Sequence, residues 1–187
     1  SVQSMYGSPN ITSWGNNKTN NDNLSLTVNL SEPVTFNATA NQSITEWHWL
    51  KDNVDQGNDF DNFSTSWNTV GTKTIKALAI NSNGTSNNIT WIVSVQIVQT
   101  ISACGELNVD GAKYTLIQNI TSPSTCLVVM ANNITIDGSG YTITYSSTEN
   151  GDPNGAGTGY AIDNKGGYNN VTIKNVNILQ NPSSYQH

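Results

Sequence analysis

Charged side chains are scarce in this chain. Of its 187 residues, 7 are basic and 13 are acidic, so only 11% are charged and the formal net charge is −6. A weakly acidic surface disfavours binding to nucleic acid and to anionic lipid, because their negative charges repel it. No apolar run reaches the roughly 20 residues that a transmembrane helix needs, so the sequence predicts no membrane span.

Cysteine and histidine are also rare, with two of each. Cys104 and Cys126 form an even pair, which in a secreted chain favours a disulfide. A reactive thiol or a metal site is the alternative. A metal site needs more ligands than the cysteines and the two histidines, His48 and His187, are placed to supply.

Asparagine is abundant where charge is scarce. Twelve asparagines open an Asn-x-Ser/Thr sequon, the acceptor motif for N-linked glycans. They are Asn10, Asn17, Asn23, Asn29, Asn37, Asn41, Asn62, Asn83, Asn88, Asn119, Asn133 and Asn170. A chain rich in Asn and Thr produces some sequons by chance, but this number favours an extracellular glycoprotein. We expect sequons in turns, such as Asn83, to be better acceptors than any whose asparagine points inward.

The first half of the chain alternates apolar and polar residues in short runs separated by turns. This pattern predicts strands over 11–14, 24–30, 34–38, 44–50, 73–80 and 88–98. Residues 81–84 read as a hairpin turn, and 51–61 as a loop rich in turn residues. Short strands at this spacing are typical of a β-sandwich.

This half resembles a PKD domain, an immunoglobulin-like module common on archaeal surfaces. The resemblance is carried by Val34-Thr35-Phe36, Trp47-His48-Trp49, Ser66-Trp67, Gly71-Thr72-Lys73-Thr74-Ile75 and Asn81-Ser82-Asn83-Gly84. Trp47, Trp49, Trp67 and Trp91 would suit a carbohydrate platform if they were exposed. Strand alternation, and the resemblance, instead imply that at least Trp49 and Trp67 lie in the sandwich core.

Four aspartates cluster in the predicted loop, namely Asp52, Asp55, Asp59 and Asp61. Ca²⁺ takes about six to eight oxygen ligands, so a structural calcium site is one interpretation and a solvated acidic loop is the other. PKD domains often carry an aromatic-Asp-Phe-Gly-Asp-Gly run after the third strand. Here the run is Trp49-Leu50-Lys51-Asp52-Asn53, so the family lends no ligand role to these acids. No other metal and no cofactor is predicted.

The second half contains one phrase twice. Asn132-Asn133-Ile134-Thr135-Ile136 returns as Asn169-Asn170-Val171-Thr172-Ile173, and Gly140-Tyr141-Thr142-Ile143 is echoed by Asn175-Val176-Asn177-Ile178. Alternation places Ile134, Ile136 and Ile143 on one face, and Asn and Gly supply the turns. A repeat of strand, turn and strand predicts stacked coils, each of which buries its apolar residues only against a neighbour. Residues 145–159 interrupt the repeat and predict a loop.

This half resembles the start of a right-handed parallel β-helix, as in the NosD-like and pectate-lyase-like repeat proteins of archaea. The resemblance is carried by residues 103–107, 112–116, 126–129, 131–138 and 169–173. It implies a cap followed by about two coils, with the disulfide fastening the cap to the first coil. The sequence therefore predicts an all-β chain with a PKD-like sandwich over residues 1–98, a short joint at 99–103, and a parallel β-helix over 99–187.

Catalysis is the least favoured interpretation of these coils. Asp137 and Asp163 fall near turns of adjacent coils, where a carboxylate pair would suit polysaccharide chemistry, but Asp137-Gly138 is also ordinary turn chemistry. A lyase needs a strong base and a stabilising cation. The coil region has no Arg, and its only His is His187. We therefore predict no catalytic residue and no enzyme.

Incomplete stacking suggests a function. A solenoid generally needs about three or more coils to be stable alone, so we expect the last coil to expose strand edges and apolar side chains. A second copy covering it head to tail would build a filament, sheath or surface layer. The sequence predicts a structural, N-glycosylated extracellular protein of an archaeal cell surface that assembles with itself. An adhesin or glycan-binding surface module with further coils is the alternative.

Overall fold

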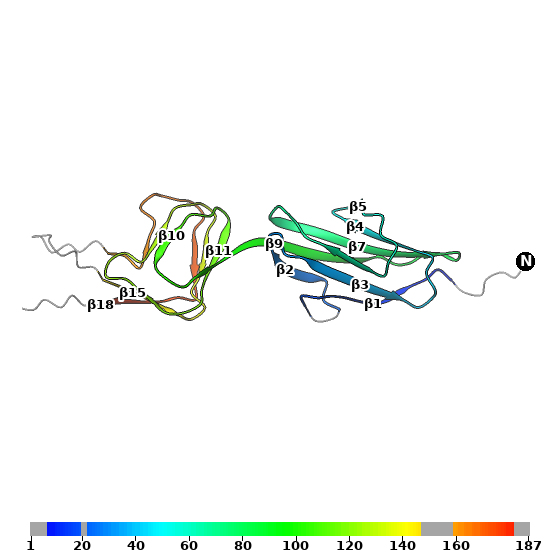
Figure 1. Cartoon of the computed structure of the whole chain (residues 1–187), viewed down its shortest axis with the longest axis horizontal. Coiled ribbons are helices and arrows are strands. Elements are labelled where there is room, and N and C mark those ends of the chain that lie inside the picture. Colours follow the sequence, from blue (N-terminus) through cyan, green and yellow to red (C-terminus); the bar gives the residue numbers. More distant parts are fainter. Residues whose placement is uncertain (1–6, 20–21, 147–158, 182–187) are drawn as a thin grey trace, which may run out of the picture. The chain divides into compact units, whose positions relative to one another are not determined.

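The computed structural model describes residues 7–19, 22–146 and 159–181 (Figure 1). Every regular element in these ranges is a β-strand, which confirms the all-β prediction for this part of the chain. The chain divides into two compact units, Ser1–Gln96 and Ile97–His187. The division falls within strand β9 (Ile89–Ile101), which supplies strand residues to both units. Much of the expected joint at 99–103 is therefore strand.

One sheet of the first unit has three antiparallel strands. β3 (Val34–Ala40) lies between β1 (Ile11–Asn16) and β6 (Asn62–Thr65). Alternation along β3 buries Val34, Phe36 and Ala38. β1, predicted as a strand over 11–14, lies at one edge of the sheet, and β6, at the other edge, was not among the predicted strands.

The larger sheet of the first unit is built around a long strand, β7 (Gly71–Asn81). β7 pairs antiparallel with β4 (Glu46–Lys51) and with β9, and β2 (Ser25–Asn29) joins β9 in parallel. Short β8 (Gly84–Thr85) closes the predicted hairpin turn against β7. Short β5 (Val54–Asp55) pairs with β4 inside the region expected to be loop. The two sheets form separate layers in Figure 1.

The core between these layers is aromatic. Trp49 and Trp91 have no exposed surface, and the Trp49 ring lies 5.8 Å from both Phe63 and Trp91. Trp47 and Trp67 are buried too, at 7% and 3% exposure. The prediction that Trp49 and Trp67 belong to the core is confirmed. A carbohydrate platform built from these four tryptophans is excluded by their burial.

The second unit consists of three parallel sheets, and successive turns of the chain add strands to them in rotation. The first sheet continues from β9 through β11 (Ala112–Leu116) and β14 (Thr135–Asp137) to β17 (Thr172–Lys174). The second contains β10 (Gly105–Leu107), β13 (Leu127–Val129) and β16 (Ile162–Asp163). The third contains β12 (Ile120–Thr121), β15 (Thr142–Ser146) and β18 (Asn177–Asn181).

The repeated phrase sets the register of this stack. Ile136 pairs with Ile173, and Ile143 pairs with Ile178, so equivalent residues of the two copies lie directly over each other. Asn133 and Asn170, at the equivalent turn, share a left-handed backbone with φ of 57° and 55°, a conformation that asparagine tolerates better than most residues. Most of the expected loop at 145–159 lies outside the described residues.

Candidate functional site

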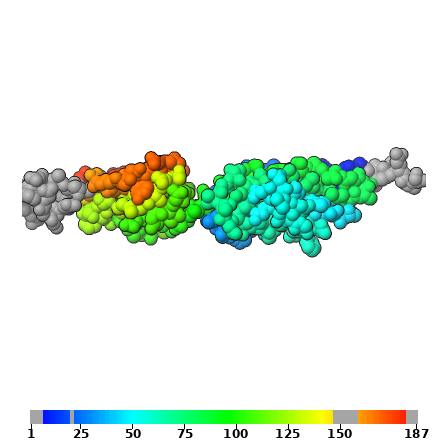
Figure 2. All heavy atoms as spheres, turned by 90° about the horizontal axis from the view of Figure 1, so that it is seen from above, coloured from blue at the N-terminus to red at the C-terminus, as the bar shows by residue number. Residues whose placement is uncertain are grey.

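The two last strands, β17 and β18, expose residues whose equivalents one turn earlier are buried. We call these two strands the last rung. Ile136 and Ile143 are 0% exposed, whereas their register partners Ile173 and Ile178 are 47% and 55% exposed. Figure 2 shows the segment that carries β16 and β17, coloured orange, at the surface of the second unit. Among the described residues, β17 and β18 pair with β14 and β15, and no strand pairs with the far side of the last rung.

The backbone of the last rung is also open on one side. Within the described ranges, β17 pairs only with β14, and β18 only with β15. An edge strand carries a row of unpaired N–H and C=O groups that another strand can use. The last rung therefore combines exposed apolar side chains with the hydrogen-bonding groups that a further strand would need.

A carboxylate sits between two lysines on the sheet that ends in β17. Asp137 Oδ2 lies 3.3 Å from Lys113 Nζ and 3.7 Å from Lys174 Nζ. Hydrogen bonds from the Asn175 amide (3.2 Å) and the Ser139 N–H (3.1 Å), and then Lys113, lower the pKa of Asp137 to about 2. Asp137 is only 8% exposed, so its charge is balanced within the stack.

Side-chain amides continue the stack at the turn before these strands. Asn133 Nδ2 donates to Asp110 Oδ1 at 3.3 Å, and Asn170 Nδ2 donates to Asn133 Oδ1 at 3.1 Å. The Asn169 N–H donates to Asn132 Oδ1 at 2.9 Å. Repeating asparagine at this turn thus lets each coil bind the next through its side chains. The sequons at Asn133 and Asn170 belong to this ladder.

Eleven of the twelve sequon asparagines are exposed. For the three that lie in strands, Asn29, Asn37 and Asn62, the period of the strand explains the exposure, because Asn-x-Ser/Thr places the asparagine and the hydroxyl on one face and the middle residue on the other. Asn37 and Thr39 flank buried Ala38, and the Thr35 and Ser64 hydroxyls on the same face lie 2.7 Å apart. No residue of β1, β3 or β6 is charged, so the outer face of this sheet carries only amides and hydroxyls as its polar groups.

Asn83 is the one sequon asparagine of the twelve that is not exposed. It is only half-buried, but its Nδ2, the atom that would carry a glycan, donates to Gln42 Oε1 at 3.1 Å. The half-buried position of Asn83 therefore gives no support to the expectation that sequons in turns are the better glycan acceptors. A turn can use its own amide groups to hold its shape.

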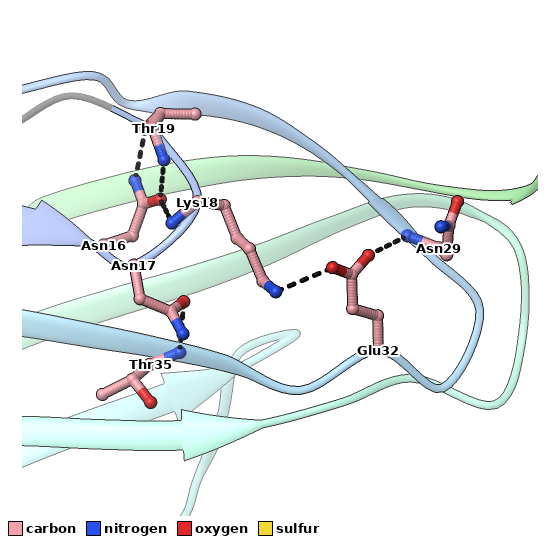
Figure 3. Close-up of polar contacts among 7 residues, drawn as sticks. All are labelled: Asn16, Asn17, Lys18, Thr19, Asn29, Glu32 and Thr35. Atoms are coloured by element: carbon pink, nitrogen blue, oxygen red, sulfur yellow. Dashed lines mark hydrogen bonds and ion pairs between the residues drawn. The ribbon is translucent and has the colours of Figure 1, made fainter.

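Two of the exposed sequons are held by a small polar network (Figure 3). Asn17 Oδ1 accepts a hydrogen bond from the Thr35 N–H at 3.0 Å, which leaves its Nδ2 outside this bond. Glu32 accepts from the Asn29 N–H at 2.8 Å and pairs with Lys18 at 2.7 Å. These contacts, the Lys18 hydrogen bond first, lower the pKa of Glu32. The fold thus fixes the backbone around both acceptors.

Three of the four aspartates proposed as calcium ligands engage separate partners. Asp52 accepts from the Thr74 N–H at 2.8 Å, and Asp61 accepts from the Asn62 amide at 3.0 Å. Asp55 lies 2.5 Å from His48. In residues 7–19, 22–146 and 159–181, no group of three or more His, Cys, Asp or Glu residues is arranged to hold a metal ion. The structure therefore does not assemble Asp52, Asp55, Asp59 and Asp61 into one site.

His48 instead forms a small acid–base cluster on β4 and β5. Its ring nitrogens lie 2.5 Å from Asp55 and 3.0 Å from Glu46. The hydrogen bond to Asp55 is the largest cause that raises the pKa of His48, and the two nearby charges add to it. The same contact helps to lower the pKa of Asp55, after the hydrogen bond from the Gly57 N–H. This cluster links the two strands of a hairpin at the surface.

Asp137 and Asp163, the two acids considered for catalysis, lie in different sheets. Asp137 is in β14, between Lys113 of β11 and Lys174 of β17, and Asp163 is in β16, where its carboxylate lies 3.9 Å from Lys165. The two carboxylates contact different lysines, and among the described residues no ion pair or hydrogen bond joins one carboxylate to the other. Cys104 and Cys126 form the predicted disulfide.

Comparisons with known proteins give no family. No family model and no curated protein matches this chain. Among solved structures, the N-terminal four Ig domains of Dscam1 isoform 6.9 match at 17% identity and a TM-score of 0.30, over 41% of this chain and 19% of that one. A candidate alpha-galactosidase of Bacteroides fragilis matches at 11% identity and a TM-score of 0.34, over 84% of this chain and 41% of that one. The described residues contain no helix long and apolar enough to cross a membrane.

Proposed function

We propose that this chain is a structural, N-glycosylated protein of an extracellular assembly, and that further copies associate with it head to tail through the last rung. The observation that carries this proposal is a difference in exposure between isoleucines that pair with each other on neighbouring strands. Ile173 and Ile178 are about half exposed, at 47% and 55%, whereas Ile136 and Ile143 directly beneath them are fully buried. Covering two such side chains with a further strand would remove apolar surface from water, which is favourable.

The fold interpretation that goes with this proposal is a PKD-like sandwich followed by a short parallel β-helix. Three parallel sheets that gain strands in rotation support the second part of it. Within the described residues, the last rung exposes apolar side chains and open strand edges together, and surfaces of this kind favour pairing with a further strand. A head-to-tail contact that does not close on itself builds a filament, a sheath or a surface layer.

An extracellular location agrees with two features. The disulfide between Cys104 and Cys126 suits an oxidising compartment. Eleven exposed sequon asparagines suit a protein whose surface carries N-linked glycans. Glycans would also hydrate a surface that has few charges, since only 11% of the residues are charged.

The proposal is tested by light scattering and electron microscopy of the secreted chain. We expect the wild-type protein to form elongated assemblies whose mass rises with concentration. The double variant Ile173→Thr/Ile178→Thr, which keeps β-branched residues in both strands, should remain monomeric. Ile117→Thr is the matched control, because Ile117 is 50% exposed and lies outside the last rung.

Two results would overturn this function. One is a wild-type chain that stays monomeric at every concentration, because its exposed isoleucines would then attract no second copy. The other is a double variant that assembles as the wild type does. Far-UV circular dichroism of each variant, with the disulfide verified by mass spectrometry, ensures that a loss of assembly does not reflect a loss of folding.

A further inference from the structure

We propose that the copy that covers the last rung places a carboxylate against Lys174, so that this lysine selects an acidic partner strand. The inference rests on the proposed function and adds the chemistry of the partner surface. Its basis is the pair of ion contacts across the sheet formed by β11, β14 and β17: Asp137 contacts Lys113 diagonally on one side and its register partner Lys174 on the other. A carboxylate on a further strand would contact Lys174 from its open side as Asp137 does from the other.

The charges of these three side chains do not cancel. Asp137 supplies the one carboxylate, whose Oδ2 lies 3.3 Å from Lys113 Nζ and 3.7 Å from Lys174 Nζ. The side chains of Asp137 and Lys113 are 11% and 34% exposed, whereas that of Lys174 is 48% exposed. Lys174 therefore shares its only ion-pair partner among the described residues and still has room for a second carboxylate.

β17 shows which kind of strand would fit beside it. In β14, buried Ile136 is followed by Asp137, and these two residues pair with Ile173 and Lys174 of β17. The open side of β17 offers the same two surfaces again, one apolar and one cationic. A strand with an apolar residue followed by an acid would cover both at once, with backbone hydrogen bonds along the edge.

A second copy is the occupant that the charges favour. The chain has 13 acidic and 7 basic residues, so acids predominate among its charged groups. Two of the seven lysines, Lys165 and Lys174, lie on or just after the terminal strands β16 and β17, with side chains 63% and 48% exposed. Opposite charge patches steer association and fix register. The cationic end of one copy is thus complementary to acidic groups of another.

Suitable acids are present on edge strands of the chain. β5 ends its sheet and carries Val54, which is 63% exposed, followed by Asp55. β10 ends its sheet within the described residues and carries exposed Glu106. β5 reproduces the order of an apolar residue and an acid found in β14. Either strand brings a carboxylate to an edge at which pairing with a further strand is open.

Zero-length crosslinking tests the contact directly. Assemblies grown from equal amounts of ¹⁴N- and ¹⁵N-labelled chains are treated with a carbodiimide, which joins an amine to a carboxylate only when they touch. We expect peptides in which Lys174 of one isotope is bonded to Asp or Glu of the other. If Lys174 is found crosslinked only to Asp137 of its own chain, or not at all, the inference is overturned.

Charge variants provide a second readout. Lys174→Gln should weaken assembly about two- to fivefold, the size of an exposed ion pair, and Lys174→Glu should weaken it further. Added salt should reduce the difference in assembly strength between Lys174→Glu and the wild type, because salt screens the repulsion between charges. Lys76→Glu, on β7 of the first unit, makes the same change in net charge and should assemble as the wild type does.

The outcomes separate this inference from the function beneath it. If the wild type assembles, the isoleucine double variant does not, and both Lys174 variants assemble as tightly as the wild type, the function stands and the carboxylate contact is wrong. If no variant and no wild-type chain assembles, both are wrong. Weakening by Lys174→Glu alone, with an inter-copy crosslink at Lys174, supports both.

Discussion

Cys104 and Cys126 fasten two successive turns of the second unit at the point where their strands begin to pair. Their Cα atoms are 4.6 Å apart, and the N–H of Gly105, the first residue of β10, donates to the Cys126 carbonyl at 2.9 Å. β10 has a neighbour on one side only, β13, in the described part of the chain. The covalent bond thus holds an edge strand that its few hydrogen bonds would hold weakly.

Removing this disulfide should destabilise the second unit. The bond spans 22 residues of sequence, and closing a loop of that size is worth about 3 kcal/mol in the chain-entropy model. We expect Cys104→Ser/Cys126→Ser to lower the free energy of unfolding by about that amount, measured by chemical denaturation followed by far-UV circular dichroism.

The first unit supplies an internal control for that measurement. All five tryptophans lie at positions 14 to 91, so tryptophan fluorescence reports on the first unit alone. The fluorescence transition should keep its midpoint in the double serine variant. A second unit that is equally stable without the disulfide would contradict the prediction.

Acid should weaken the stack around Asp137. The pKa of Asp137 is lowered from its usual 3.8 to about 2, so folding favours the ionised form. A lowered pKa stabilises the fold above the unfolded value, and this stability is lost as pH falls through the folded value. The difference in melting temperature between wild type and Asp137→Ala should therefore be largest above pH 3.8 and shrink towards pH 2.

Alanine, and not asparagine, replaces Asp137 in this test because of the two residues that follow it. Asp137→Asn would create an Asn-Gly-Ser sequon with Gly138 and Ser139 and introduce a possible glycan. Glu106→Gln, which neutralises an exposed carboxylate in the same unit, is the control. A difference between wild type and Asp137→Ala that stays constant from pH 5 to pH 2 would show that the ion pairs contribute nothing.

Trp49 should be the most costly of the tryptophans to truncate. It has no exposed surface, its ring stacks with Phe63 and Trp91, and its Nε1 donates to the Phe60 carbonyl at 2.8 Å. Trp49→Ala should cost about 3 to 5 kcal/mol of unfolding free energy. Phe60→Ala, at a side chain 72% exposed, should change it by less than about 0.5 kcal/mol. Urea denaturation followed by circular dichroism measures both, and equal costs would contradict the packing argument.

Glycan occupancy should follow the hydrogen bonding of each acceptor. Asn37 is exposed on β3 and its amide nitrogen has no partner among the described residues, whereas Asn83 Nδ2 donates to Gln42. In protein secreted from a glycosylating host, we expect Asn37 to be modified in most molecules and Asn83 in few. Mass spectrometry of peptides before and after glycan removal gives both values. Equal occupancy at Asn37 and Asn83 would count against the role of the hydrogen bond.

Local patterns were enough to predict much of the fold. Period-two alternation located β3, β7 and β9, because each strand buries one face and exposes the other to water. The repeated phrase also predicted register, since Ile136 and Ile173 hold the same place in it and do pair. Two cysteines in a chain with many sequons were enough to predict the disulfide.

Other features depend on partners that no local pattern reveals. β5 has two residues, too few to show any alternation, and it exists because β4 lies beside it. The phrase that Ile173 shares with Ile136 does not show which of the two is exposed, so the expectation of an exposed last coil came from the number of repeats instead. Spacing along the loop suggested that Asp52 and Asp55 were neighbours, but the hairpin sends them to Thr74 and His48.

The polar groups on the outer face of β1, β3 and β6 neither gain nor lose a proton over the ordinary range of pH. Water binds such amides and hydroxyls as readily in brine as in dilute buffer, because there is no fixed charge for counterions to shield. This side of the molecule should therefore stay equally well hydrated from acid to alkali and from fresh water to salt.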